Sequence, residues 1–169
     1  PFDPIGPGVV ETLAAGVLDD DHRADLEATG ETSCGWSVPG VGRFRVAVHR
    51  QRGSLAMVVR RVPPEIPQLE ELGLPLQVER FAQEEHGLVL VTGPPVSGKT
   101  KTVAAVLDHI NRTRACLVLT IEYPIEVLHA DAQSIMTQRE VGTDTVSYAD
   151  ALHSGLRQDA DVIFVGELL

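Results

Sequence analysis

The sequence predicts an α/β protein whose second half forms a mostly parallel sheet covered by helices. Three apolar runs without alternation, Leu88–Val91, Ala115–Ile121 and Val162–Val165, are typical of strands buried on both faces. Segments with apolar residues at helical spacing, Lys101–Ile110 and Ser147–Gln158, lie between these runs. A strand–helix–strand–helix–strand order indicates parallel strands joined by helices.

The first half of the chain predicts a smaller α+β part. Val9–Leu18 and Asp20–Ala28 are expected to be helices. Arg43–Gln51 alternates apolar and polar residues, as a half-buried strand does. Arg52-Gly53 then provides a turn into a second strand at Ser54–Arg61, so we expect an antiparallel hairpin here.

Prolines mark the boundary between the two parts. Val62–Pro67 holds three prolines in six residues, which neither a helix interior nor a central strand accommodates. We therefore predict an N-terminal domain at residues 1–62, a proline-rich linker at 63–75 and a second domain at 76–169. The second domain is expected to begin with a helix at Leu76–Glu85.

The composition narrows the class of protein. The formal net charge is −10, from 24 acidic and 14 basic residues, so general binding to nucleic acid is disfavoured. Two cysteines without a paired spacing argue against a zinc site or a disulfide framework and suit a reducing cytoplasm. No apolar run approaches the roughly 20 residues that span a bilayer, so membrane insertion is not expected.

A glycine-rich loop carries the most specific signal. Gly93–Thr100 reads GPPVSGKT and matches the phosphate-loop pattern of Gly, four residues, then Gly-Lys-Thr. A predicted strand at Gly87–Thr92 leads into it and an amphipathic helix follows, so backbone N–H groups and a helix N-terminus can meet a phosphate. Lys99 would reach the terminal phosphates of ATP, and the Thr100 hydroxyl would bind Mg²⁺. The predicted nucleotide-binding residues are Gly93, Ser97, Gly98, Lys99, Thr100 and Lys101.

The loop departs from the common pattern at two places. Val96 stands where many such loops have glycine, and a β-branched residue tolerates a positive φ poorly. Pro94 and Pro95 lack N–H donors. The early loop positions contribute least to phosphate binding, so we expect a reduced nucleotide affinity mainly from Val96.

Two carboxylates follow the predicted strands. Glu122 comes directly after Ala115–Ile121, and Glu167 follows Val162–Val165 after one glycine. Ligands of open α/β sheets bind beyond the carboxyl ends of the strands, so one carboxylate could order Mg²⁺ and the other could orient the attacking water. The alternative is that both are solvated strand-end acids.

Arginines are concentrated on the predicted hairpin. They could bind a phosphate group or an acidic partner, or they could simply form a solvated face of the strands. They are Arg43, Arg45, Arg50, Arg52, Arg60 and Arg61.

Four segments resemble, in order, the bacterial secretion and type IV pilus ATPases, and most closely the pilus-retraction (twitching motility, PilT-like) branch. They are GLVLVTGPPVSGKTKT, LTIEYPIE, QREVG and LRQDADVIFVGE. GRFRVAVHRQRGSLAMVVRRVP and LEELGLP also resemble the end of that family's N-terminal, PAS-like domain. The resemblance runs from about Val38 to Glu167.

The resemblance implies a cytoplasmic homo-hexameric ATPase, peripheral at the inner membrane, that acts on a pilus platform protein there. Each subunit would pair a PAS-like α+β domain with a RecA-like phosphate-loop domain, of which this sequence holds only the N-terminal part. The family's later histidine box and C-terminal helices do not occur in it.

The resemblance also assigns roles to single residues. Glu167 is implied as the catalytic carboxylate, with Glu122 and Glu126 in the acidic box. Arg52 and Arg60 match arginines that reach the nucleotide from the N-terminal domain. The catalytic candidates are therefore Glu167, Glu122, Arg52 and Arg60.

Two departures from the family pattern concern the metal. Gly166 replaces the usual acidic residue on the last strand, and Tyr123 replaces an Asp of the acidic box. Two alternatives to the retraction ATPase stay open: a pilus-extension or type II secretion ATPase, and a nucleotide-binding subunit that no longer hydrolyses ATP.

Overall fold

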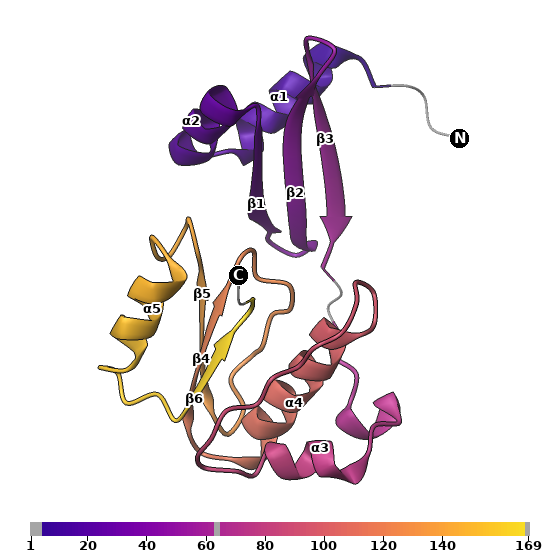
Figure 1. Ribbon diagram of the computed structural model, residues 1–169. Coiled ribbons are helices and arrows are strands. Elements are labelled where there is room, and N and C mark those ends of the chain that lie inside the picture. Colours follow the sequence, from indigo (N-terminus) through magenta and orange to yellow (C-terminus); the bar gives the residue numbers. More distant parts are fainter. Residues whose placement is uncertain (1–4, 63–64, 168–169) are drawn as a thin grey trace. The chain divides into compact units, whose positions relative to one another are not determined.

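The computed structural model describes residues 5–62 and 65–167. The chain forms two compact units, residues 1–62 and 63–169, each of which is described by itself (Figure 1). The prolines that open the predicted linker, Pro63 and Pro64, lie outside the described residues.

The first unit is a three-stranded antiparallel sheet with two helices. The strand order is β1-β2-β3. Both predicted helices and the hairpin are confirmed, whereas β1 was not predicted. The elements are α1 (Pro7–Val17), α2 (Asp20–Thr29), β1 (Glu31–Val38), β2 (Gly42–Gln51) and β3 (Ser54–Arg61).

Both helices pack on one face of this sheet. Ala14 and Leu26 of the helices share a buried cluster with Val46 and Val48 of β2. Trp36 of β1 and Phe44 of β2 are register partners on the same face, with ring centroids 5.8 Å apart. Aromatic cross-strand pairs of this kind stabilise a sheet, so the core lies between the helices and β2.

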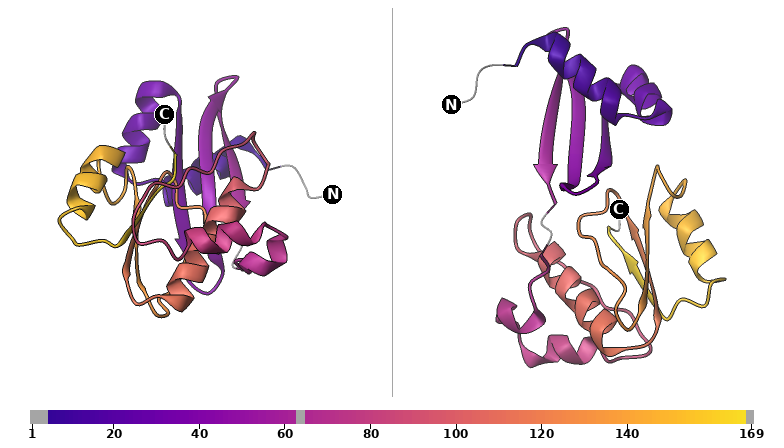
Figure 2. Two further views of the ribbon diagram at one scale, coloured as in Figure 1. Left: turned by 60° about the horizontal axis from the view of Figure 1, so that its bottom comes forward. Right: turned by 180° about the vertical axis from the view of Figure 1, so that it is seen from behind.

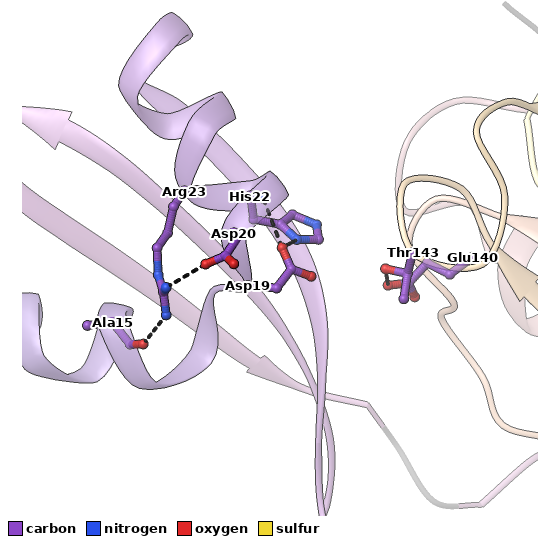
Figure 3. Close-up of polar contacts among 7 residues, drawn as sticks. All are labelled: Ala15, Asp19, Asp20, His22, Arg23, Glu140 and Thr143. Carbon is purple, nitrogen blue, oxygen red and sulfur yellow. Dashed lines mark hydrogen bonds and ion pairs between the residues drawn. The ribbon is translucent and has the colours of Figure 1, made fainter.

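The start of α2 is fixed by a side-chain cap (Figure 3). The Asp19 carboxylate accepts a hydrogen bond from the backbone N–H of His22 at 2.9 Å, as an N-cap does. The same N–H contact is the main cause that lowers the pKa of Asp19. Arg23 bonds to Asp20 and to the backbone oxygen of Ala15, which ties α2 to α1.

The second unit holds a three-stranded parallel sheet in the order β5-β4-β6. Figure 2 shows the sheet between α4 and α5, which cover its two faces. The mixed α/β class is thereby confirmed. The elements are a 3₁₀ turn η1 (Leu69–Leu72), α3 (Leu76–Phe81), α4 (Lys99–Thr113), β4 (Leu117–Glu122), β5 (Ile135–Glu140), α5 (Tyr148–Gly155) and β6 (Val162–Val165).

Alternate residues of β4 face the two helices. Val118 packs with Leu107 and Ile110 of α4. Leu119 and Ile121 pack with Ala151 of α5. β4 is therefore buried on both faces, as its apolar run predicts.

One predicted strand is absent from the structure. Leu88–Val91 is a loop, and its side chains are exposed, with Leu88 82% accessible. A strand needs a neighbour that pairs with its backbone, and no strand among the described residues pairs with this segment. The predicted helix at Leu76–Glu85 is also shorter, ending at Phe81.

The third strand of the sheet is instead β5, which was not predicted. Asn111, at 2% exposure in α4, holds the segment that leads into it. Its side-chain N–H donates to the Ala130 oxygen at 2.7 Å, and its side-chain oxygen accepts from the Ala132 N–H at 3.1 Å.

Within the described ranges, no helix has the length and apolar character to cross a membrane.

Candidate functional site

The loop from Gly93 to Gly98 leads directly into α4. Gly98 has φ 96° and serves as the N-cap of the helix. Gly93 has φ 156°, and a Cβ there would lie 2.8 Å from the Ser97 Oγ, so a larger residue would be strained and would displace the Ser97 side chain. The Lys99 ammonium folds back over the loop and donates to the Gly93 and Pro94 oxygens at 2.9 and 3.0 Å.

Val96 sits at the crest of this loop with a positive φ of 66°. That backbone region is unfavourable for a β-branched residue. Its side chain is fully exposed, so no packing contact offsets the strain. The positive φ of Val96 therefore strains the backbone of this loop.

The orientation of α4 brings its first turn to the carboxyl edge of the sheet. A three-residue link joins the end of α4 to the start of β4, and the helix and strand pack side by side. A 15-residue helix is about 22 Å long and a six-residue strand about 20 Å. The first turn of α4, which holds Lys99 and Thr100, therefore lies near the level of the end of β4, whose last residue is Glu122. Figure 1 shows α4 beside β4. Thr100 and Lys101 are exposed.

Glu122 is a buried carboxylate, 7% exposed, at the end of β4. By strand alternation it shares the α4 side with Val118 and Thr120. It accepts hydrogen bonds from the Thr120 hydroxyl at 2.7 Å, the Gln138 side-chain N–H at 3.3 Å and the Glu126 N–H at 3.3 Å. Burial nevertheless dominates and raises the pKa of Glu122.

Gly166 lies against Glu122. Its N–H donates to the Ile121 oxygen at 2.8 Å, continuing the pairing of β6 with β4. A Cβ at this position would lie 3.3 Å from that oxygen and 3.6 Å from the Glu122 Cγ. The Glu122 side chain therefore lies next to Gly166, which has no side chain of its own.

Glu167 is exposed and contacts α5. The Tyr148 hydroxyl donates to its Oε1 at 3.4 Å. Partial burial and the negative charge of Glu167 together raise the pKa of Tyr148 to about 12. Glu122 and Tyr123 contribute to the same increase, so the four groups surround one end of the sheet.

A second buried glutamate lies at the end of the neighbouring strand β5. Glu140, the last residue of β5, is 3% exposed and is the register partner of Glu122. It accepts from the Ile125 N–H at 2.8 Å and from the Thr143 hydroxyl at 3.5 Å (Figure 3). Glu140 therefore connects the loop after β4 with the loop after β5, and the backbone N–H of Glu126 in the first of these loops donates to Glu122.

Arg52 and Arg60 belong to the first unit. Arg52 has φ 48° and forms the turn between β2 and β3 with Gly53, φ 80°. Arg60 lies near the far end of β3, opposite Arg45. Six residues of strand, about 20 Å, separate Ser54 from Arg60. Both arginines are exposed, at opposite ends of one hairpin.

The structure brings some predicted residues together and leaves others apart. Lys99 contacts its own loop, and Glu122 and Glu167 share one sheet edge. Neither carboxylate hydrogen-bonds to the loop within the described part of the chain. Sequence reasoning missed Gln138 and Tyr148; Gln138 lies on the unpredicted β5, and Tyr148 opens α5 beside Glu167.

The comparisons with known proteins point to one family. The chain is 43% identical over 159 residues to the type IV pilus retraction ATPase PilT of Pseudomonas aeruginosa, covering 94% of this chain and 46% of that protein. It is 40% identical over 159 residues to a twitching motility protein of Neisseria gonorrhoeae, covering 94% and 42%. The chain thus spans about half the length of these curated relatives.

A solved structure agrees in fold. The pilus retraction motor PilT, crystallised with bound ADP, superposes with a TM-score of 0.88 at 49% identity, over 94% of this chain and 46% of that one. The sequence model of the Type II/IV secretion system protein family matches residues 43–168. The chain therefore belongs to the Type II/IV secretion system protein family and resembles the retraction ATPases within it.

Proposed function

We propose that this chain is the nucleotide-binding part of an ATPase that powers type IV pilus retraction. The observation that carries the proposal is the glycine-shaped loop Gly93–Gly98 at the start of α4, level with the buried Glu122. The similarity to retraction ATPases, one of them solved with ADP, supports the same function.

ATP would bind at the loop through backbone N–H groups and Lys99. The loop leads into the N-terminal end of α4, where the helix dipole favours an anion. On binding, the Lys99 ammonium would exchange the Gly93 and Pro94 oxygens for phosphate oxygens. Ser97, Gly98, Thr100 and Lys101 would complete the contacts to the phosphates.

The chemistry of two residues supports a proposed Mg²⁺ ion. Glu122 is a buried carboxylate whose pKa burial raises, so a nearby cation would stabilise its charged form. Thr100 has an exposed hydroxyl in the first turn of α4. Glu122 and Thr100 would hold the ion, which neutralises charge on the phosphates during transfer. Glu122 would thereby take the place of the acidic residue that the family usually has at the position of Gly166.

Glu167 would act on the attacking water. One carboxylate oxygen accepts a hydrogen bond from Tyr148, and the other, which has no hydrogen bond to any described residue, would accept a proton or orient a water molecule. Glu122 is buried on the α4 side of the sheet, which suits it to binding the cation. Glu167 is exposed, which suits it to contact with water. The two carboxylates therefore divide the roles by environment.

Arg52 and Arg60 would contribute positive charge from the N-terminal domain. Phosphoryl transfer builds negative charge, and an arginine that arrives from another domain can raise its rate by about 10³ or more. The domain would have a PAS-like fold, and the second unit would be the N-terminal part of a RecA-like domain. Because the two arginines occupy opposite ends of a hairpin, each is tested by itself.

The assembly would be a homo-hexamer in the cytoplasm, peripheral at the inner membrane and in contact with a pilus platform protein. This part of the proposal rests on the family resemblance. A pilus-extension or secretion ATPase would use the same site, and twitching motility restored in a retraction-deficient strain distinguishes the retraction role from both.

The test of hydrolysis is Glu167→Gln in the full-length protein. The amide keeps the shape of the side chain and loses its basicity, so nucleotide affinity should persist while single-turnover hydrolysis falls at least about 100-fold. If Glu167→Gln hydrolyses ATP at the wild-type rate, the catalytic role belongs to Glu122. Absence of turnover in the wild type, with ATP bound, would favour a subunit that binds but no longer hydrolyses, which the strained Val96 and the replaced Asp at Tyr123 both suit.

The arginines are tested by Arg52→Ala and Arg60→Ala, with Arg23→Ala as the control on the same domain. We expect each hairpin variant to lower turnover with little change in ATP affinity, whereas Arg23→Ala should not. If Arg52→Ala and Arg60→Ala both turn over like the wild type, these arginines are surface charges only.

A further inference from the structure

We propose that Tyr148 is a positioning residue for Glu167, holding one oxygen of this carboxylate so that the other faces the reacting water. The proposal rests on the function proposed above, in which Glu167 acts on water. The observation behind it is the hydroxyl of Tyr148 at 3.4 Å from the Glu167 Oε1.

Glu167 needs such a restraint because little else fixes it. It lies two residues beyond the end of β6 and is exposed. The last backbone hydrogen bond before it is that of the Gly166 N–H to Ile121. Within the described residues, the Tyr148 hydroxyl is the hydrogen-bond partner of its carboxylate. A general base must be held in hydrogen-bond reach of the proton that it accepts.

Tyr148, by contrast, stands on a rigid support. Its ring packs in the buried cluster formed by Leu119, Ile121 and Ala151. It is the first residue of α5, whose start is capped by Ser147 accepting from the Asp150 N–H at 3.1 Å. Farther along, Gly155 lets the helix approach β4 closely. The ring is therefore packed against β4, the strand that pairs with β6, and β6 precedes Glu167.

The chemistry of the pair suits this role. A phenol that stays protonated at neutral pH is a reliable donor to a carboxylate, and burial with the nearby Glu167 charge raises the pKa of Tyr148 to about 12. A carboxylate that accepts one such hydrogen bond keeps a second oxygen for water. Tyr148 itself touches neither water nor nucleotide in this account and acts through Glu167.

The decisive variant is Tyr148→Phe in the full-length protein, because it removes the hydroxyl and keeps the packed ring. We expect kcat to fall about tenfold, the lower end for a hydrogen bond to a charged group, with an unchanged KM for ATP and an unchanged melting temperature. The matched control is Ser154→Ala on the same helix, which removes a hydroxyl bonded to Gln158. It should leave kcat at the wild-type value.

A spectroscopic measurement tests the contact without turnover. In protein labelled at the tyrosine Cζ with ¹³C, the Tyr148 resonance is identified by its loss in Tyr148→Phe. We expect Glu167→Gln to shift this resonance at neutral pH, and Glu85→Gln, an exposed loop substitution, to leave it in place. No shift in Glu167→Gln would overturn the proposal.

The kinetic outcomes separate this inference from the proposed function. If Glu167→Gln abolishes turnover while Tyr148→Phe turns over like the wild type, the positioning role is wrong and the catalytic role of Glu167 stands. If Glu167→Gln itself turns over like the wild type, the catalytic assignment is wrong, and the positioning role falls with it.

Discussion

Val96 shows how one residue can strain a glycine-rich loop. Its positive φ of 66° costs about 1–2 kcal/mol for a side chain of this kind, and no contact of the exposed side chain compensates. We predict that Val96→Gly stabilises the second unit by about 1 kcal/mol, since glycine removes the strain and returns only part of the gain as chain entropy. Thermal unfolding of the two proteins measures the change.

Val146→Gly provides the control for this prediction. Val146 is also exposed, and its φ is not positive. At position 146 glycine relieves no strain and only increases the conformational entropy that the chain loses on folding, so the substitution should destabilise the protein by up to about 1 kcal/mol. Equal effects at the two positions would show that Val96 carries no strain.

Glu122 makes a prediction about pH. Its folded-state pKa is raised by burial, so the folded protein binds the proton more tightly than the unfolded chain does. Its contribution to stability therefore decreases as pH rises from its unfolded pKa, about 4.5, through its higher folded pKa, and stays low above that. Glu122→Gln removes this titration.

We accordingly expect the stability of Glu122→Gln, relative to the wild type, to be greater at pH 7 than at pH 4.5. Unfolding curves at a series of pH values, with Glu85→Gln as the exposed control, provide the measurement. A difference between Glu122→Gln and the wild type that is constant over this range would mean that burial does not perturb the carboxyl.

The residues around Glu122 also show what a sequence can reveal about a site. A position directly after a long apolar run predicts a side chain at the carboxyl edge of a sheet, and Glu122 lies there. Its partner Gln138 had no such signal, because it belongs to a partly polar strand that only long-range pairing with β4 creates. Contacts within a motif can be predicted; contacts between distant segments need the fold.

At the scale of elements, two helical glycines make opposite predictions. A Cβ on Gly155 of α5 would lie 2.2 Å from the Cδ2 of Leu119, which is 1% exposed. Gly16 of α1 has nothing within 4 Å. Alanine is favoured over glycine in a helix by about 1 kcal/mol, and overpacking a core costs about 1–3 kcal/mol.

Gly16→Ala should therefore stabilise the first unit by about 1 kcal/mol, and Gly155→Ala should destabilise the second by about 1–2 kcal/mol. Thermal unfolding that follows each unit separately measures both. If Gly155→Ala is stabilising, Leu119 repacks freely and α5 does not approach β4 as closely as described.

The strands show where sequence patterns succeed and fail. Ala115–Ile121 predicts β4 because the strand is central and buried on both faces. The equally apolar Leu88–Val91 does not form a strand, since no described strand pairs with it. β1 was not predicted, although Thr32, Cys34 and Trp36 alternate with small or polar residues. The glycine and serines between them weaken its strand propensity.

At the scale of the whole chain, charge is unevenly distributed. Residues 32–62 contain six arginines and no acidic residue, whereas the chain as a whole has a net charge of −10. Arg45 and Arg60 are direct cross-strand partners on β2 and β3. The excess of positive charge in this part of the sequence is consistent with the proposed contribution of the first unit's arginines to a nucleotide site.

The central claim is that the loop Gly93–Gly98 and Lys99 bind Mg·ATP. Isothermal calorimetry with ATP and Mg²⁺ on the wild type, Lys99→Ala and Arg112→Ala tests it most directly. Arg112 lies at the other end of α4, paired with Asp108, so its variant removes one positive charge from the same helix away from the loop. We predict that Lys99→Ala loses about 1.5–3 kcal/mol of binding free energy, roughly 10- to 150-fold in Kd, and that Arg112→Ala binds like the wild type. Equal affinity in the wild type and Lys99→Ala would contradict the account.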